Sequence, residues 1–175
     1  MAMLWQENFI DASRHWTGRG QGFEAPLGEN VLQLPGGIVF STQPIDKEWP
    51  TEFAAEARPL FKGYRFDRLR QPIFKYLVGD VTIEDKPLPE VVEDRPLFKR
   101  NLRIVTSGTK TISYLAAVGK AIEVDGETIK VGEDYKTKLT NVKEIKLIKL
   151  GDKQAAVAII DLSSGVVEVE QSYDW

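Results

Sequence analysis

The chain has 175 residues, of which 42% are apolar and 28% are charged, and its formal net charge is −3. This length and composition predict one globular domain and exclude a wholly disordered chain. The net negative charge gives no indication of a basic surface that would bind nucleic acid. The absence of cysteine excludes disulfides, thiolate metal sites, iron–sulfur clusters and cysteine nucleophiles.

Both ends of the chain have the character of ordered sequence. No stretch approaches the ~20 consecutive apolar residues of a membrane helix, and the first residues lack the basic and apolar regions of a signal peptide. Residues 4–9 and 166–175 are rich in apolar side chains, whereas free termini are usually frayed and polar. We therefore expect residues 1–175 to be a single β domain excised from a longer chain, without membrane insertion.

Residues 11–30 are polar and rich in glycine, which predicts a long irregular loop near the N-terminus. A loop of this length attached to a regular fold is either disordered or functional. Its densest part contains four candidate ligand-binding residues, Asp11, His15, Trp16 and Arg19. An aromatic ring beside arginine and aspartate can stack on a sugar and bind its polar substituents. The alternative is that Trp16 plugs one end of the fold while Arg19 bonds loop carbonyls.

His15 is the single histidine of the chain. It could act as a general base, a metal ligand or an axial haem ligand. A zinc site would need carboxylates for all its other ligands, because the chain has neither cysteine nor a second histidine. We therefore predict no metal site and no cofactor, and we favour a surface or capping role for His15.

Residues 49–58 are the one segment that could hold a short helix, with Thr51 as its cap. From residue 61 onward, alternating apolar and polar side chains predict successive strands. The predicted strands are 61–69, 73–78, 81–83, 97–105, 112–118, 142–150, 155–162 and 166–170, and residues 122–131 are predicted to form a hairpin.

Turn residues link most of these strands. Gly79-Asp80 predicts a tight turn that closes a three-stranded meander, and Asp125-Gly126 predicts a type I′ hairpin. Pro87 and Pro89 predict an extended edge or a crossing segment. The pattern as a whole predicts an all-β fold, an antiparallel β-sandwich with a long Gly-rich N-terminal loop, for which the mutarotase-like sandwiches are a candidate relation.

No catalytic machinery is identifiable in the sequence. The chain has neither a Gly-x-Ser-x-Gly nucleophile motif nor a phosphate-binding Gly-x-x-x-x-Gly-Lys-Ser/Thr loop. Its 26 acidic residues include no pair that spacing alone marks as the acid and base of a glycosidase. The sequence therefore assigns no catalytic residue.

Several aromatic and turn motifs are shared with a known type of domain. They are Trp5 with Phe9-Ile10-Asp11, Trp16-Thr17-Gly18-Arg19-Gly20, Pro26-Leu27-Gly28, Trp49-Pro50, Phe61 to Asp67, Pro72 to Tyr76, and the closing Tyr173-Asp174-Trp175. In this pattern the chain resembles an accessory domain of large secreted bacterial proteins that combine a sugar-dehydrogenase-like β-propeller with a c-type cytochrome module. The haem-attaching Cys-x-x-Cys-His motif is absent, as is the segment that normally precedes the tryptophan strand.

The resemblance implies a β fold, an extracytoplasmic (periplasmic or secreted) parent protein and an accessory role beside redox modules. We expect a non-catalytic module that binds carbohydrate or docks neighbouring domains of the parent chain. It would use an exposed aromatic platform at Trp16, with Trp5, Trp49 and Tyr64 as further members. The alternatives are a sugar-active enzyme, epimerase- or glycosidase-like, that uses carboxylates or His15, and a structural spacer with every tryptophan buried.

Overall fold

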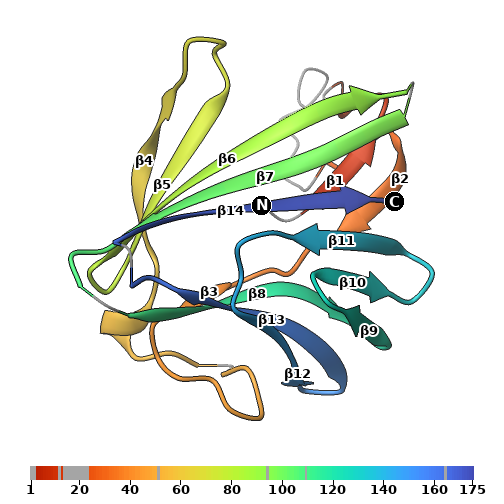
Figure 1. Ribbon diagram of the computed structural model, residues 1–175. Helices are drawn as coiled ribbons and strands as arrows, with labels where there is room; N and C mark the ends of the chain where they lie inside the picture. Colours follow the sequence, from red (N-terminus) through yellow and green to blue (C-terminus); the bar gives the residue numbers. More distant parts are fainter. Residues whose placement is uncertain are drawn as a thin grey trace.

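The computed structural model describes residues 3–11, 13, 24–50, 52–93, 95–108, 110–163 and 165–175. Antiparallel sheets packed face to face make up nearly all of this structure, which confirms the all-β sandwich (Figure 1). No helix in the described part of the chain is both long and apolar enough to cross a bilayer.

The larger layer is an eight-stranded antiparallel sheet with the strand order β4-β5-β6-β7-β14-β11-β10-β9. Its strands are β4 (Leu60–Phe66), β5 (Pro72–Val78), β6 (Val81–Val92), β7 (Arg95–Val105), β9 (Ile122–Asp125), β10 (Thr128–Val131), β11 (Tyr135–Leu139) and β14 (Val166–Asp174). Strands β4 to β7 form a continuous meander, and β14 joins this meander to the small hairpins of β9 to β11. The β4–β5 hairpin stands out from the body of the molecule (Figure 1).

The second layer is a four-stranded sheet with the order β12-β13-β8-β3, and a separate two-stranded ribbon is made of β1 and β2. Their bounds are β1 (Met3–Gln6), β2 (Glu29–Gln33), β3 (Phe40–Ser41), β8 (Thr111–Gly119), β12 (Glu144–Leu150) and β13 (Lys153–Asp161). Leu4, Leu32 and Leu34 bring the ribbon into the main core.

The four-stranded sheet is covered on both faces. Its inner face packs on the eight-stranded sheet in the main core, which includes Ile112, Tyr114 and Ile160. Its outer face carries a second cluster, in which Trp49 and other residues from 45–57 cover side chains of β8, β12 and β13. Every residue from 155 to 160 is buried, since β13 lies between these two coverings.

Two predicted turns are confirmed as hairpins, one with a different register. Gly79 and Asp80 connect the pair Val78–Val81. In the second hairpin Asp125 is still paired with Thr128, so the two turn residues are Gly126 and Glu127. Only Gly126 of these two has a positive φ, 57°. This is the pattern of a type II′ turn, and the prediction of a type I′ turn was wrong.

The prolines of β6 lie in an extended edge, as predicted. Pairing of β6 with β5 ends at Asp85, whereas pairing with β7 continues to Val92. Pro87 and Pro89 therefore sit where one side of β6 has no neighbouring strand among the described residues. Proline is tolerated there because no ladder hydrogen bond is required from its nitrogen.

Two other predictions need correction. The helix expected over residues 49–58 is reduced to one 3-10 turn, η1 (Ala55–Ala57), because Trp49 and Phe53 are drawn onto the four-stranded sheet. Strand β11 was missed, although its Tyr135, Thr137 and Leu139 are buried and the lysines between them are exposed. The signal was the same period of two that identified the other strands.

Candidate functional site

Three of the predicted binding residues, His15, Trp16 and Arg19, lie outside the described residues. Asp11 is described and exposed, and its Oδ1 accepts a hydrogen bond from the backbone nitrogen of Ser13 at 2.9 Å. The predicted role of these four residues in ligand binding stays a prediction.

Trp49 does not belong to an exposed platform. Its side chain is only 3% exposed, and its Nε1 donates to the carbonyl oxygen of Ile38 at 3.1 Å. The ring lies 5.9 Å from that of Phe53, in the cluster on the outer face of the four-stranded sheet. The prediction is corrected because Ile45, Trp49, Phe53 and Ala57 cover this face of the sheet, with Trp49 as the largest side chain among them.

Trp5 lies on β1 and lines an open hollow of about 840 Å³. Its ring stacks on Phe9, with a centroid separation of 5.8 Å and an interplanar angle of 20°, and Phe9 is 70% exposed. The Trp5 Nε1 donates to the carbonyl oxygen of Asn8 at 3.0 Å, which fixes the indole. Neither Trp49 nor Tyr64 lines this hollow, so the structure does not bring the predicted platform together.

The other walls of this hollow, called the Trp5 groove below, come from distant parts of the chain. Pro89 and Val91 of β6, Pro96 and Phe98 of β7, and the C-terminal Trp175 supply apolar surface. Glu7 and Glu90 supply carboxylates, and Glu90 Oε2 is 3.2 Å from the Nζ of Lys99. Aromatic faces beside a few carboxylates are the usual chemistry of a sugar-binding groove, in which rings stack and hydroxyls donate hydrogen bonds.

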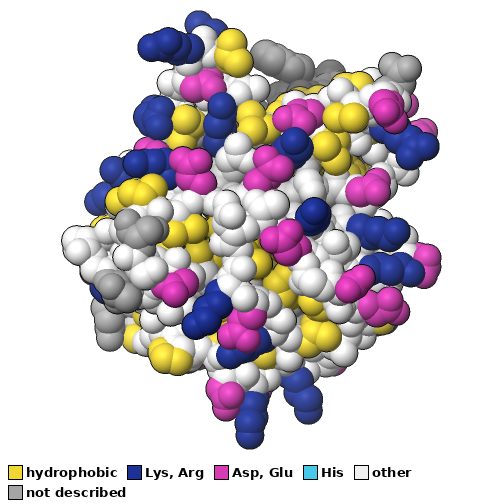
Figure 2. All heavy atoms as spheres, in the orientation of Figure 1, with side chains coloured by type: hydrophobic (Ala, Val, Ile, Leu, Met, Phe, Trp, Pro, Cys, Tyr) yellow, Lys and Arg dark blue, Asp and Glu magenta, His cyan; other side chains and the backbone are white. Residues whose placement is uncertain are grey.

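Tyr64 occupies a different surface, on the projecting β4–β5 hairpin. It is 61% exposed, packs edge-on against Phe66 at 5.5 Å, and lies 6.1 Å from Phe74 on β5. Five large apolar side chains of this hairpin are more than half exposed: Leu60, Phe61, Tyr64, Phe66 and Leu69. On the face drawn in Figure 2, acidic and basic side chains are interspersed with apolar ones instead of being separated by sign.

Sequence analysis missed a buried polar network that joins the two layers. Arg100 on β7 points inward and bonds Asp85 with both Nε and Nη2, at 2.8 and 2.6 Å. Its Nη1 donates to the hydroxyl of Tyr114 at 2.7 Å, and that hydroxyl donates to Gln171. The Gln171 amide then donates to Thr137 at 3.0 Å. A charged residue at an inward position of an apolar strand was the available signal.

This network is fully partnered, and its ionisation states follow from its contacts. Burial alone disfavours the Arg100 cation, but Tyr114 and Asp85 hold the pKa of Arg100 well above its ordinary value. Burial raises the pKa of Tyr114 and raises that of Tyr173 well above its ordinary value. Each of the three guanidinium nitrogens has a hydrogen-bond partner, and we assign the network a structural role, the fixing of the two sheets to each other.

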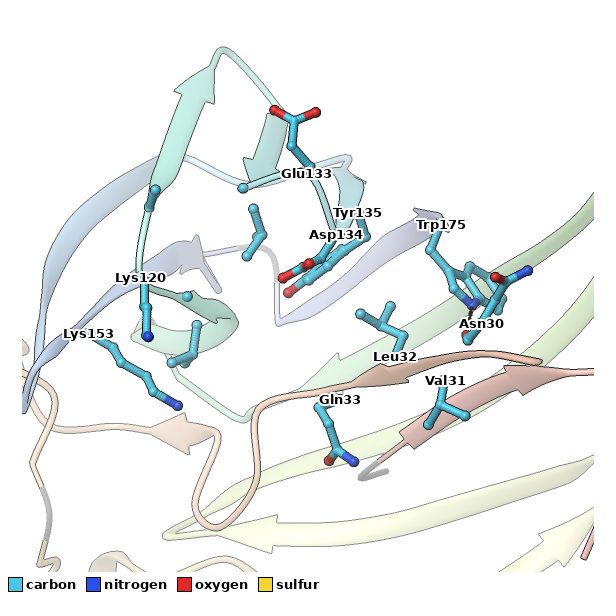
Figure 3. Close-up of a pocket in the computed structure, with 15 residues that line it drawn as sticks. Asn30, Val31, Leu32, Gln33, Lys120, Glu133, Asp134, Tyr135, Lys153 and Trp175 are labelled. Atoms are coloured by element: carbon cyan, nitrogen blue, oxygen red, sulfur yellow. Dashed lines mark hydrogen bonds between the residues drawn. The ribbon is translucent and has the colours of Figure 1, made fainter. Parts of the chain in front are cut away.

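A second hollow lies on the other side of Trp175, between β2 and the turns that follow β8 and β10 (Figure 3). Its volume is about 640 Å³, and Trp175 lines both this hollow and the Trp5 groove. The Trp175 Nε1 donates to the carbonyl oxygen of Asn30 at 2.7 Å, which holds the indole between the two hollows. The sequence marked Trp175 only as part of the closing aromatic motif.

Among the described residues, no group of three or more histidine, cysteine, aspartate or glutamate side chains could hold a metal ion. Comparisons of the chain with protein-family models, with curated proteins and with solved structures give no match.

Proposed function

We propose that this chain is a non-catalytic accessory domain that binds carbohydrate in the Trp5 groove. The observation that carries the proposal is the stacked pair of Trp5 and Phe9 in the lining of a groove whose other walls are largely apolar or aromatic. Phe9 leaves most of its ring in contact with water, so this aromatic surface is accessible to a ligand in the groove.

The proposed setting is an extracytoplasmic multidomain parent that also carries a sugar-dehydrogenase-like propeller and a cytochrome module. This setting rests on the sequence resemblance alone. A carbohydrate-binding accessory domain would hold a polymeric substrate near the modules that oxidise it, which raises the local substrate concentration.

The test is intrinsic tryptophan fluorescence of the isolated chain, titrated with a panel of plant and algal oligosaccharides. We expect a saturable shift in the native chain that is lost in Trp5→Ala and kept in Tyr64→Ala, the matched removal of an exposed aromatic ring elsewhere. Circular dichroism would verify that both variants are folded. A panel without response, or a Trp5→Ala variant that binds as well as the native chain, would refute the proposal.

A second candidate function is the docking of a neighbouring domain of the parent chain onto β4. The specific observation is that β4 is the last strand of its sheet and carries Phe61, Tyr64 and Phe66 more than half exposed. Exposed apolar edge strands pair readily with another strand. Hydrogen exchange of the β4 amides should then be slower in the longer parent chain than in residues 1–175 alone, and equal rates would exclude this docking.

A further inference from the structure

The hollow of Figure 3 has a cationic end. Gly119 of β8 pairs with Gln154 of β13, so the next residues along, Lys120 and Lys153, lie opposite each other where the two strands begin to separate. Figure 3 shows both ammonium groups directed into the hollow. A Cβ at Gly119 would lie 2.5 Å from Val131, so only glycine allows this close approach of β8 to β10.

Neither of these two lysines forms an ion pair in the described part of the chain. Like charges directly across a strand pair repel and are destabilising. The nearby Glu133 does not neutralise them, because its Oε1 is bound to Lys130 Nζ at 2.9 Å. An anionic group between the two ammonium groups would remove this repulsion.

The remaining walls offer hydrogen-bond acceptors and flat apolar surface. Figure 3 shows the Asp134 carboxylate beside the Tyr135 ring, apart from the two lysines, with Leu32 and Trp175 beyond. The Tyr135 hydroxyl is buried and is the one buried side-chain polar atom of the described residues that has no hydrogen-bond partner.

We propose that this hollow binds a uronic acid unit, so that the carbohydrate ligand of the domain is an acidic oligosaccharide. The carboxylate lies between the ammonium groups of Lys120 and Lys153, and the sugar hydroxyls face Asp134. The sugar ring packs toward Trp175. Because Trp175 lines both hollows, the same oligosaccharide continues past it into the Trp5 groove. This inference rests on the proposed carbohydrate-binding function and specifies its ligand class.

The experiment is a titration of the ¹⁵N-labelled chain with tetragalacturonate and, separately, with the neutral tetramer cellotetraose, followed through the backbone amide shifts. The acidic tetramer should shift the amides of Gly119, Lys120, Gly132 and Tyr135. In the variant Lys120→Ala/Lys153→Ala its affinity should fall about tenfold or more, because two charge-assisted contacts are lost. The control Lys75→Ala/Lys143→Ala makes the same change in net charge and should alter affinity less than about twofold.

Each outcome separates this inference from the proposed function. Equal binding of both tetramers, with shifts confined to the Trp5 groove, would keep carbohydrate binding and overturn the acidic ligand. An equal loss of affinity for the acidic tetramer in the lysine variant and its control would also overturn the acidic ligand. The attraction would then come from the net charge of the chain and not from Lys120 and Lys153. If neither tetramer shifts any amide, both the acidic site and carbohydrate binding by this chain are wrong.

Discussion

The two parts of the eight-stranded sheet make different use of the same alternating sequence pattern. On β7, Phe98, Arg100, Leu102 and Ile104 are all buried against the four-stranded sheet. On β4, no side chain is buried, although its aromatic residues are of the same kinds as the buried aromatic residues of the main core. Alternation therefore identifies a strand, whereas burial of one face requires a second layer behind that strand.

The difference follows from the widths of the two layers. The eight-stranded sheet is wider than the four-stranded sheet that covers it, so β4 and β5 project beyond the cover (Figure 1). A β-bulge between Phe61 and Tyr64 further interrupts the pairing of β4 with β5. The residues that stabilise the fold are accordingly concentrated in β6, β7, β14 and β8. The side chains of the projecting hairpin remain exposed and available for surface interactions.

The largest effect is expected when the buried network is broken. Arg100→Leu should lower the free energy of unfolding by about 3–5 kcal/mol, because it leaves the Asp85 carboxylate buried and unpaired. Arg103→Leu changes the same kind of side chain on the outward face of the same strand, where its ion pair with Glu84 is 3.6 Å long, and should cost about 1 kcal/mol or less. Urea denaturation measures both, and equal losses would show that the network has no special role.

Apolar truncation tests the same contrast without charges. Leu102→Ala in the main core should cost about 2–5 kcal/mol, because Leu102 is fully buried and a cavity would remain. Phe66→Ala on β4 should cost less than about 1 kcal/mol, since that ring is 55% exposed. A large loss for Phe66→Ala would mean that the hairpin is part of the cooperative core.

Alkaline pH should destabilise the core selectively. The pKa values of Tyr114 and Tyr173 are raised above the ordinary value of 10.0, so these hydroxyls stay protonated in the folded chain while the unfolded chain loses their protons. The stability they contribute is complete below pH 10 and declines above it, by up to about 1.4 kcal/mol per pH unit for each tyrosine. Urea titrations from pH 9 upward should show a shallower decline in Tyr173→Phe; identical slopes would contradict this assignment.

The smallest effect is expected at the turn of the projecting hairpin. The hydrogen bond from Lys86, 2.8 Å away, together with backbone hydrogen bonds, lowers the pKa of the Asp67 carboxyl. Its stabilising contribution is therefore present above the ordinary value of 3.8 and is lost as the pH falls through the lowered pKa. Lys86→Met should raise the Asp67 pKa toward that value in an NMR titration, with little change in melting temperature. An unchanged Asp67 pKa would assign the effect to the backbone hydrogen bonds alone.

The sequence predicted Trp5 and Trp49 alike as members of an exposed aromatic platform, whereas the structure leaves Trp5 partly exposed and buries Trp49. Each of the two tryptophans has an acidic residue and an apolar residue within two positions. What separates them is tertiary packing, because Trp49 lies with Ile45 and Phe53 on the outer face of the four-stranded sheet and is buried there. The sequence did not indicate Lys120 and Lys153 for the same reason, because only the pairing of β8 with β13 brings these two residues to one hollow.

The sequence by itself determined the fold class, most of the strands and the turns that link them, since a period of two and turn-forming residues are local properties. It could not determine which strands share a layer, the inward place of Arg100 beside Asp85, or the position of Trp175 between two hollows. These depend on contacts between residues far apart in the chain, such as Arg100 with Tyr114 and Trp175 with Asn30. Local patterns carry no information about such pairings, and the packing of the two sheets decides them.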